Sequence, residues 1–462
     1  MTSDGGIFGL TAQAKARLLE KLATSRLSRG ATSEARKAGS TAVEDDFENL
    51  SGYREMRMIR AAGEALGISN PYFRVHDAIA GAETSIGGKT YLNFASYNYV
   101  GLNGDPRVSE AAKAAIDRYG TSVSASRLVS GERGIHRELE QALAEVYSAE
   151  DCIALVSGHA TNVTVVGNLI GPNDVVLHDA LIHNSVLQGA LLSGATRVAF
   201  PHNDHAAAER LLAGNRSRHR RALLVIEGHY SMDGDVPDLA AFIALARRHR
   251  AWLLVDEAHA LGVLGARGHG IAERCGVDPK EVDLWMGTLS KSLAGCGGYI
   301  AGRRALVEYL KFSAPGFVYS VGMPPPVAGA AREALRLLNA EPERVAKLAR
   351  NAGLFLKRAK AAGLDTGFSV GAAIVPIITG GSIRAGRLAE AMYRRGVNVQ
   401  PILYPAVPEP LARLRFFVSS QHTEAQIEQA VAILAEENAK VGSEDSNMLS
   451  LTKLLGIGGS KA

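Results

Sequence analysis

The amino-acid sequence predicts an α/β fold, with a large domain built on a mostly parallel sheet and a smaller C-terminal α+β domain. From Tyr91 onward, short apolar runs alternate with segments of helical periodicity, which is the pattern of a parallel sheet covered by helices on both faces. The chain has 462 residues, of which 47% are hydrophobic and 21% charged, so it can bury a large core. Ligands of such sheets bind at the carboxyl ends of the strands.

The apolar runs place the strands along the chain. Those expected in the large domain are residues 153–156, 175–177, 198–200, 223–226, 253–255 and 284–286. After Pro324-Pro325-Pro326, a helix-rich segment leads to three further runs in the small domain, at residues 374–377, 397–400 and 415–418. The predicted divisions are an N-terminal extension (1–48), an N-terminal arm (49–95), the large domain (96–330), the small domain (331–442) and a tail (443–462).

The two ends of the chain each contain one helix candidate. An amphipathic pattern runs from Thr11 to Leu27 and is followed by a linker rich in Ser, Ala and Gly. The tail contains a short apolar pattern from Met448 to Leu455. It can dock on the body of the protein, on a partner or on a membrane surface, and we favour docking on the body over peripheral membrane contact.

Composition excludes several classes of function. The net charge is only +4, and the one basic cluster, Arg216 to Arg221, is expected to be a solvated turn, so we predict no nucleic-acid partner. The three cysteines have neither metal-ligand nor redox spacing, which predicts no metal site and favours a reducing compartment. No run is long enough for a transmembrane segment and no secretion signal is visible, so we expect a cytoplasmic protein.

One lysine is placed as the lysine of a pyridoxal 5'-phosphate (PLP) enzyme would be. Lys291 follows an apolar run and stands among Thr288, Ser290 and Ser292. A lysine that forms a Schiff base needs a site that lowers its pKa, with donors nearby for the cofactor phosphate. Taken alone, a lysine in such a turn is more often simply solvated.

Other strand ends carry groups that agree with a PLP site. Asp256 ends one run and can keep a pyridinium nitrogen protonated. Gly158 permits close backbone approach where a helix should begin, and helix N-termini suit phosphate groups. His183 offers a ring that can stack on a flat cofactor, and Ser231 a hydroxyl at the same level. The sequence lacks the glycine-rich dinucleotide and P-loop patterns and the H-E-x-x-H zinc pattern.

Several motifs together resemble one enzyme family over roughly residues 90 to 440. They are residues 96–102, 126–131, 157–162, 231–235, 256–259, 288–291 and 323–325. With these motifs the chain resembles the α-oxoamine synthases, PLP enzymes of fold type I that include serine palmitoyltransferase, aminolevulinate synthase, aminooxononanoate synthase and aminoketobutyrate ligase. The resemblance implies PLP fold type I and a decarboxylating condensation of an amino acid with an acyl thioester, which gives an α-amino ketone.

The resemblance also implies roles for catalytic residues. Lys291 would form the Schiff base and move the α-proton of the substrate, and Asp256 would pair with the ring nitrogen. His259 and Ser231 would contact the phenolic oxygen, while His183 would stack on the pyridine face.

Further roles concern the phosphate and the substrate. Thr288, with the backbone around Gly158 and His159, would hold the phosphate. Arg415 would grip the amino-acid carboxylate, for which a guanidinium fork is suited. Ser320 would replace the hydroxyl residue that relatives direct at the neighbouring subunit's phosphate, because Val321 stands in that place. A homodimer is expected, since the family builds its site at the subunit interface.

The expected amino-acid substrate follows from a few positions where this chain departs from its relatives. Tyr97 and Asn98 are the predicted substrate-binding pair, and they stand where several relatives have Asn-Asp. Gln400 stands where an arginine is common. Both features favour a serine palmitoyltransferase-like enzyme or a module associated with polyketide synthases. Serine is therefore the first expected amino acid, followed by glycine and alanine.

Alternatives stay open on the carrier and on the reaction. The thioester can be carried by CoA or by an acyl carrier protein, and residues 1–48 can engage such a carrier or serve as a dimer-strapping or disordered arm. A PLP aminotransferase on the same fold is a second class of function. A noncatalytic partner subunit is a third, against which Lys291 argues.

Overall fold

The computed structural model describes residues 46–454 and the side chains of residues 46–443. These residues form two compact units. The large unit holds residues 76–376 and 416–431, and the small unit holds the described parts of residues 1–75, 377–415 and 432–462. The domain boundaries predicted above stay a prediction. The helix candidate Thr11 to Leu27 lies outside the described residues.

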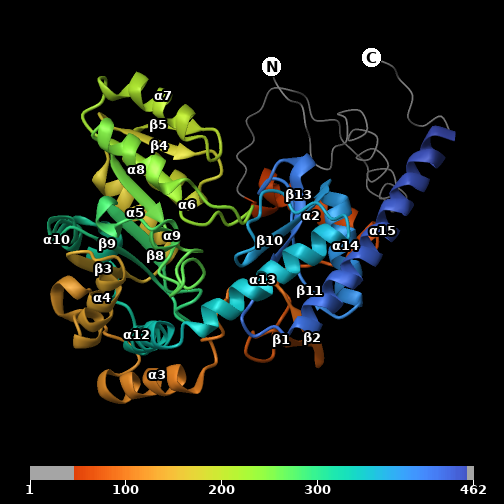
Figure 1. Ribbon diagram of the computed structural model, residues 1–462, viewed down its shortest axis with the longest axis horizontal. Helices are drawn as coiled ribbons and strands as arrows, with labels where there is room; N and C mark the ends of the chain where they lie inside the picture. Colours follow the sequence, from red (N-terminus) through yellow and green to blue (C-terminus); the bar gives the residue numbers. More distant parts are fainter. Residues whose placement is uncertain (1–45, 455–462) are drawn as a thin grey trace. The chain divides into compact units, whose positions relative to one another are not determined.

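A seven-stranded sheet forms the centre of the large unit (Figure 1). Its order is β3-β9-β8-β7-β6-β4-β5. Only β9 runs antiparallel to its neighbours, β3 and β8, so the predicted mostly parallel sheet is confirmed. The strands are β3 (Asp151–Leu155), β4 (Val175–Asp179), β5 (Thr196–Phe200), β6 (Ala222–Glu227), β7 (Trp252–Asp256), β8 (Leu284–Thr288) and β9 (Gly298–Gly302).

Two hydrophobic cores lie on the two faces of this sheet. Successive residues of β6 enter opposite cores, as the two-residue period of a strand requires. Leu224 and Ile226 belong to the core that includes residues of α4, α8 and α12. Leu223 and Val225 belong to the core that includes residues of α5, α6 and α10. The apolar runs are therefore continuous because both faces of the strands are buried.

Helices cover both faces of the sheet, as expected for β/α alternation. Those of the large unit are α3 (Pro106–Tyr119), α4 (Gly134–Val146), α5 (Gly158–Leu169), α6 (Asn184–Ser193), α7 (His205–Arg216), α8 (Leu239–Arg248), α9 (Ile271–Cys275), α10 (Arg304–Ser313), α11 (Pro315–Val318), α12 (Pro325–Ala340) and α13 (Glu343–Ala361). Short turns of other helix types are η3 (Arg127–Gly131) and η4 (Pro279–Glu281).

Three strands of the large unit were not expected from the sequence. Strand β9 pairs between β3 and β8, where the glycine-rich segment around Gly297 gave no strand signal. A Cβ on Gly298 would lie 2.7 Å from the Cα of Gly158, so this glycine lets the start of α5 approach β9. The other two strands, β1 (Glu83–Ile86) and β2 (Lys89–Asn93), form an antiparallel hairpin. Its turn residues Gly87 and Gly88 both have positive φ, as a tight hairpin turn requires.

The small unit is arranged around a three-stranded sheet of order β10-β13-β12. The predicted strands near residues 374, 397 and 415 are confirmed. The elements are η2 (Phe47–Asn49), α2 (Ser51–Ala65), β10 (Ile374–Gly380), α14 (Ser382–Arg394), β11 (Val397–Asn398), β12 (Gln400–Ile402), η5 (Glu409–Leu411), β13 (Ala412–Phe417) and α15 (Glu424–Leu454).

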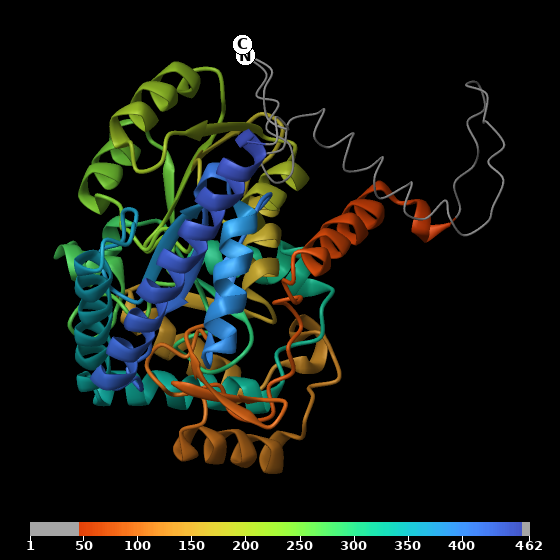
Figure 2. The same ribbon diagram turned by 90° about the vertical axis from the view of Figure 1, so that its right-hand side faces the viewer.

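The C-terminal helix differs from the prediction. Instead of a separate short helix from Met448, the chain continues α15 without a break to Leu454, as the blue ribbon in Figure 2 shows. The segment between Val441 and Met448 contains neither proline nor a helix-ending glycine pair, so nothing in it interrupts the helix. Among residues 46–454, no helix is both long and apolar enough to cross a membrane.

Candidate active site

Four neighbouring strands of the sheet bring predicted site residues to one edge. Lys291 follows β8, Asp256 ends β7, Ser231 follows β6 and His183 follows β4. These strands are adjacent and parallel, in the order β8-β7-β6-β4. Their carboxyl ends therefore meet at the edge where ligands of α/β sheets bind.

Asp256 is buried and held in one orientation. Its Oδ2 accepts a hydrogen bond from the side-chain amide of Asn162 at 2.8 Å, and its Oδ1 accepts the backbone N–H of Ala258 at 3.0 Å. The side chain is only 4% exposed. A carboxylate with both oxygens engaged by N–H donors is a well-placed partner for a cationic ring N–H.

His183 connects to the same network. Its Nδ1 lies 2.7 Å from the hydroxyl of Ser185, which in turn accepts from the amide of Asn162 at 3.0 Å. The His183 ring is exposed, and its centroid lies 6.3 Å from that of His159. Asn162 falls inside the motif 157–162 and Ser185 stands two residues after His183, but neither has a predicted role because their contacts join α5 to α6 and β7.

His259 is fixed by two tyrosines of the segment that follows β2. Its Nδ1 lies 2.8 Å from the hydroxyl of Tyr99, which is fully buried. Tyr97 meets the His259 ring edge-on at a centroid distance of 5.9 Å. The ring of Phe417 lies nearly parallel to that of His259, at a centroid distance of 6.4 Å. Sequence analysis missed Tyr99, although it stands in the same motif as Tyr97.

A second buried carboxyl lies beside Asp256. Burial and the negative charge of Asp256 together raise the pKa of Glu227 to about 8, against the opposing effect of the Ser231 backbone N–H. That N–H donates to Glu227 Oε2 at 3.1 Å, so Glu227 holds the turn that carries Ser231. Sequence analysis gave Glu227 no role, because its burial arises only when the sheet is covered.

The start of α5 and the end of β8 form a second part of the site. A Cβ on Gly158 would lie 2.8 Å from Thr288 Oγ1, so a glycine is needed for this close approach. Among the described residues, neither the N–H of Gly158 nor that of His159 donates to a protein acceptor. Thr288 is buried, and its hydroxyl lies 2.9 Å from the carbonyl of Gly297.

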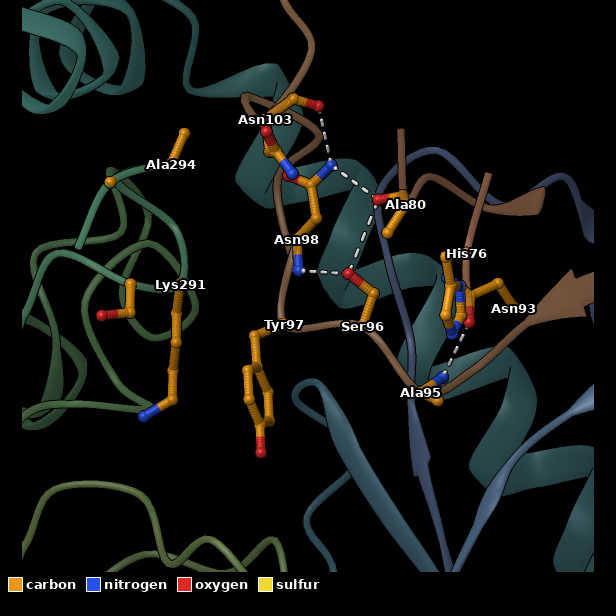
Figure 3. A pocket seen from close by; sticks show the side chains of 12 residues that line it. His76, Ala80, Asn93, Ala95, Ser96, Tyr97, Asn98, Asn103, Lys291 and Ala294 are labelled. Carbon is orange, nitrogen blue, oxygen red and sulfur yellow. Dashed lines mark hydrogen bonds between the residues drawn. The ribbon is translucent and has the colours of Figure 1, made fainter. Parts of the chain in front are cut away.

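A cavity of about 400 Å³ contains the lysine. Figure 3 shows the side chains of Lys291 and Tyr97 on its two sides, both extending in the same direction. The Lys291 ammonium lies 5.5 Å from the centre of the Tyr97 ring, within reach of a cation–π interaction. The polar residues that line the cavity are His76, Asn93, Ser96, Tyr97, Asn98, Asn103, Ser290 and Lys291.

Asn98 lines the same cavity, but its amide holds the local backbone. Its Nδ2 donates to the carbonyls of Asn103 and Ala80 at 3.0 and 3.3 Å, and its Oδ1 accepts the Asn103 N–H at 3.1 Å. Figure 3 draws the bonds from Asn98 to the carbonyls of Asn103 and Ala80 as dashed lines. Asn98 thus shapes the wall of the cavity that carries Tyr97, and its contact with substrate stays a prediction.

Two other predicted residues, Ser320 and Arg415, stand on other elements. Ser320 follows α11, and its hydroxyl donates to the carbonyl of Val321 at 3.2 Å. Arg415 belongs to the small unit, on β13, where it pairs with Gln400 of β12. The roles of Ser320 and Arg415 stay predictions.

Comparisons with known proteins agree with this geometry. The family model described as aminotransferase class I and II matches residues 89–434. A putative 8-amino-7-oxononanoate synthase of Gloeobacter violaceus is 40% identical over 374 residues, which cover 79% of this chain and 93% of the relative. The 8-amino-7-oxononanoate synthase of Geobacter sulfurreducens is 41% identical, over 77% of this chain and 90% of the relative. The chain belongs to the PLP-dependent α-oxoamine synthase family.

Solved structures of this family share the fold. A serine palmitoyltransferase from S. paucimobilis with bound PLP aligns with a TM-score of 0.82 and 29% identity, over 86% of this chain and 99% of that one. The serine palmitoyltransferase of Sphingomonas wittichii aligns with a TM-score of 0.81 and 30% identity, over the same shares. The predictions of PLP fold type I and of PLP as the cofactor are confirmed. The preference for serine palmitoyltransferase is not, because the synthases named above are 40–41% identical.

The residues of this oxoamine synthase fit PLP. Asp256 offers an anchored acid for a ring nitrogen, and the first turn of α5 offers two N–H groups beside the Thr288 hydroxyl for a phosphate. Lys291 lines the cavity at the same edge of the sheet. Acid, anion site and lysine are the three groups that PLP enzymes need.

Proposed function

We propose that the protein catalyses the decarboxylating condensation of a small amino acid, alanine or glycine before serine, with an acyl thioester. The observation that carries this proposal is the placement of Lys291, which follows β8 and lines a cavity at the sheet edge where β7 ends in Asp256. The two carboxylate oxygens of Asp256 are anchored by N–H donors of Asn162 and Ala258. The identity to oxoamine synthases over most of both chains supports the reaction type.

The relatives are named for a product whose structure favours alanine over serine as the amino-acid substrate. In 8-amino-7-oxononanoate, the amino group sits on the carbon next to a terminal methyl group. A condensation with loss of carbon dioxide yields that end from alanine, and the remaining seven carbons come from a dicarboxylic acyl group. Serine would leave a hydroxymethyl group and glycine a hydrogen in place of the methyl.

The bonds of the proposed reaction balance without an oxidant. A carbon–carbon bond forms between the α-carbon of the amino acid and the thioester carbonyl, and the carbon–sulfur bond breaks to release the thiol. The carboxylate leaves as carbon dioxide, and a proton takes its place. The products are an α-amino ketone, carbon dioxide and a thiol.

The cofactor would be held by groups of the large unit. Asp256 would hold the proton of the ring nitrogen, and His259 and Ser231 would contact the phenolic oxygen. Thr288 and the N–H groups of Gly158 and His159 would bind the phosphate. When bound, PLP withdraws electrons from the α-carbon of the amino acid, which makes loss of the α-proton and of the carboxylate possible.

Lys291 would move the proton. Its Nζ lines the cavity, and it would take the α-proton and return one after carbon dioxide leaves. The Tyr97 ring also lines the cavity, and its centre lies 5.5 Å from the Lys291 ammonium, within reach of a cation–π interaction. His183 would cover the cofactor ring, and Arg415 would bind the amino-acid carboxylate.

Two other reactions compete with this proposal, and the experiment below distinguishes them. Serine as the amino acid is favoured by the TM-scores of 0.81 to 0.82 with serine palmitoyltransferases. Amino-group transfer to an oxo acid is favoured by the description of the matching family model. Either CoA or a carrier protein can supply the acyl group, and all but the last three residues of the segment 1–48, proposed to engage a carrier, lie outside the described residues.

The experiment measures labelled carbon dioxide from carboxyl-labelled alanine, glycine and serine, each with a series of acyl-CoA esters and the same acyl groups on a carrier protein. We expect release that requires both substrates, is faster with alanine or glycine than with serine, and is absent in a Lys291→Ala variant. Release with serine and long acyl chains alone would assign the serine palmitoyltransferase reaction. Amino transfer to an oxo acid without carbon dioxide release would overturn the proposal.

A further inference from the structure

We propose that Asn162 and Ser185 are positioning residues that set which nitrogen of His183 carries the proton. They form a chain of hydrogen bonds from Asp256 to His183, and this chain keeps the His183 imidazole neutral with its proton on Nε2. The inference rests on the proposed function in one respect, the ionised state of Asp256.

The direction of the chain is set at Asp256. Its Oδ2 lies 2.8 Å from Nδ2 of Asn162. An ionised carboxylate can only accept hydrogen bonds, so the NH₂ group of Asn162 must face it. The carboxylate thus fixes which end of the Asn162 amide is the NH₂ group and which is the oxygen. Both side chains are buried, Asn162 to 1% exposure, so water does not replace the contact.

The second N–H of Asn162 determines the role of Ser185. Nδ2 lies 3.0 Å from Ser185 Oγ, and because Nδ2 is a donor, the hydroxyl oxygen accepts there. The single hydroxyl hydrogen of Ser185 is then directed to His183 Nδ1, 2.7 Å away. Ser185 is 1% exposed, so its hydroxyl is confined to these partners.

At His183 two donors face the same nitrogen. Besides the hydroxyl of Ser185, the backbone N–H of Ser185 points at Nδ1 from 3.3 Å. A proton on Nδ1 would oppose both donors, so Nδ1 is the acceptor and the neutral ring carries its proton on Nε2. Other titratable groups near this ring are His159 on α5, at 6.3 Å between ring centroids, and Glu227 at the end of β6.

The close packing of α5 on α6 makes the chain possible. A Cβ on Gly189 of α6 would lie 2.9 Å from the carbonyl oxygen of Asn162 and 3.1 Å from that of Val163. Glycine at this position therefore lets α6 approach α5 closely enough for the two side chains to meet. The chain joins Asp256 and His183 through two buried residues from two helices.

The consequence for the proposed reaction is a neutral ring beside the cofactor. An imidazolium ion would place a second positive charge next to the protonated ring nitrogen that Asp256 would hold. A neutral ring avoids that repulsion and presents Nε2–H as a donor. Loss of the chain should therefore slow turnover without releasing the cofactor.

The test is ¹⁵N NMR of the holoenzyme with labelled histidines, at a pH above the ordinary imidazole pKa. The chain has 13 histidines, so the His183 signal is assigned by its absence in a His183→Gln variant. We expect a pyridine-type Nδ1 and a protonated Nε2 in the wild type, and a mixture of both tautomers in Ser185→Ala. Asn162→Ala should give a smaller shift in the same direction.

Activity and a matched control complete the test. Ser193→Ala removes another buried hydroxyl of α6 and should leave the His183 signal unchanged. Within the described part of the chain, that hydroxyl bonds only to the carbonyl of Ala190 and the N–H of Ala195. Ser185→Ala should lower kcat about five- to tenfold, as expected for one lost hydrogen bond, with KM and PLP content nearly unchanged. Ser185→Thr keeps the hydroxyl, so its His183 signal and its kcat should match those of the wild type. A protonated Nδ1 in the wild type, or an identical signal in Ser185→Ala, would overturn the inference. The NMR measurement does not depend on turnover. If the proposed function alone fails, the wild type will still give the expected His183 tautomer but will release no carbon dioxide.

Discussion

At the scale of single residues, the site is organised by buried carboxyls that differ in their surroundings. Asp256, Glu227 and Glu257 are each at most 4% exposed, and each accepts at least one N–H donor. Burial raises the pKa of Glu257 to about 8, against the opposing effect of the Ile271 backbone N–H. Asp256 accepts from a side-chain amide as well as a backbone N–H, whereas Glu227 and Glu257 accept the backbone N–H groups of Ser231 and Ile271 and so hold the loops that carry them.

Removal of the charge on Asp256 should abolish most turnover. An Asp256→Asn variant keeps the size of the side chain but cannot keep a ring nitrogen protonated. By analogy with other preorganised electrostatic groups, kcat should fall by about 10²-fold or more while PLP stays bound. Steady-state rates and PLP absorbance measure the two effects. Asp238→Asn is the control, because Asp238 caps α8 and asparagine caps a helix equally well. An equal loss of kcat in both variants would contradict the role of Asp256.

The raised pKa of Glu227 predicts a pH-dependent cost in stability. Below the ordinary glutamate pKa of about 4.3, the group is protonated in both folded and unfolded chains. Between that pH and about 8 the unfolded chain alone loses the proton, so stability falls as pH rises. Glu227→Gln imitates the protonated acid, and its Tm should exceed that of the wild type by a margin that grows from pH 5 to 8. Thermal unfolding of both holoenzymes checks this, with exposed Glu308→Gln as control; a margin that is constant with pH would contradict it.

The residue scale also shows what the sequence could and could not predict. Lys291, Asp256 and Gly158 stand at strand ends or helix starts, where local pattern and chemistry are visible together. Asn162 and Ser185 act through contacts between elements far apart in the chain, which no local pattern contains. Their motifs were visible, but the direction of their hydrogen bonds was not.

At the scale of elements, a charged network joins two of the loops that form the site. His202 follows β5, and its two ring nitrogens lie 2.9 Å from Asp179 at the end of β4 and 2.9 Å from Asp235 beyond β6. Asp179 also accepts the Leu181 N–H in the turn that leads to His183. The hydroxyl of Tyr230, next to Ser231, donates to the same Asp179 at 2.9 Å. The network thus holds the loops after β4 and β6 together.

This network should stabilise the fold up to alkaline pH. Burial alone would lower the pKa of His202, but the hydrogen bonds to Asp179 and Asp235 raise it to about 10. Because the folded pKa lies above the ordinary value of about 6.5, the stabilisation is complete below that value and is lost as pH rises through about 10. The Tm difference between wild type and His202→Gln should therefore be largest near pH 6 and shrink toward pH 10. His205→Gln, on an exposed histidine, should show no such trend, and an unchanged difference across that range would refute the network's role.

Elements with strong periodicity were predictable, and those determined by packing were not. The strands β3 to β8 are continuous apolar runs because both of their faces are buried. Strand β9 is rich in glycine because the start of α5 lies against it, and that pattern carries no strand signal. Residues 448–454 are helical, as expected, but they continue α15 instead of forming a separate short helix, because an apolar pattern does not show where a preceding helix ends.

At the scale of the whole molecule, exposed apolar side chains of the large unit indicate a partner surface. Val129 on η3 is 81% exposed and Tyr319, after α11, is 87% exposed. The two segments are joined, since Ser126 donates to the carbonyl of Val318 at 2.7 Å. Large apolar groups gathered in this way mark interaction sites more often than scattered ones.

We expect this surface to form a homodimer that includes Ser320. Light scattering after size-exclusion chromatography should give the mass of two chains. Val129→Glu combined with Val321→Glu should shift the mass to one chain and lower PLP retention, because Ser320 lies beside Val321. Phe368→Glu alters another exposed aromatic residue and is the control. A single-chain mass for the wild type would contradict the dimer and the predicted role of Ser320.

The central claim is that Lys291 holds the cofactor in this site. Borohydride reduction of the holoenzyme fixes PLP to the lysine that carries it, and peptide mass mapping then locates the modified residue. The account predicts a pyridoxyl group on the peptide that contains Lys291, and none on that peptide in Lys291→Ala. A modified lysine elsewhere in the chain, or no modified lysine at all, would contradict it.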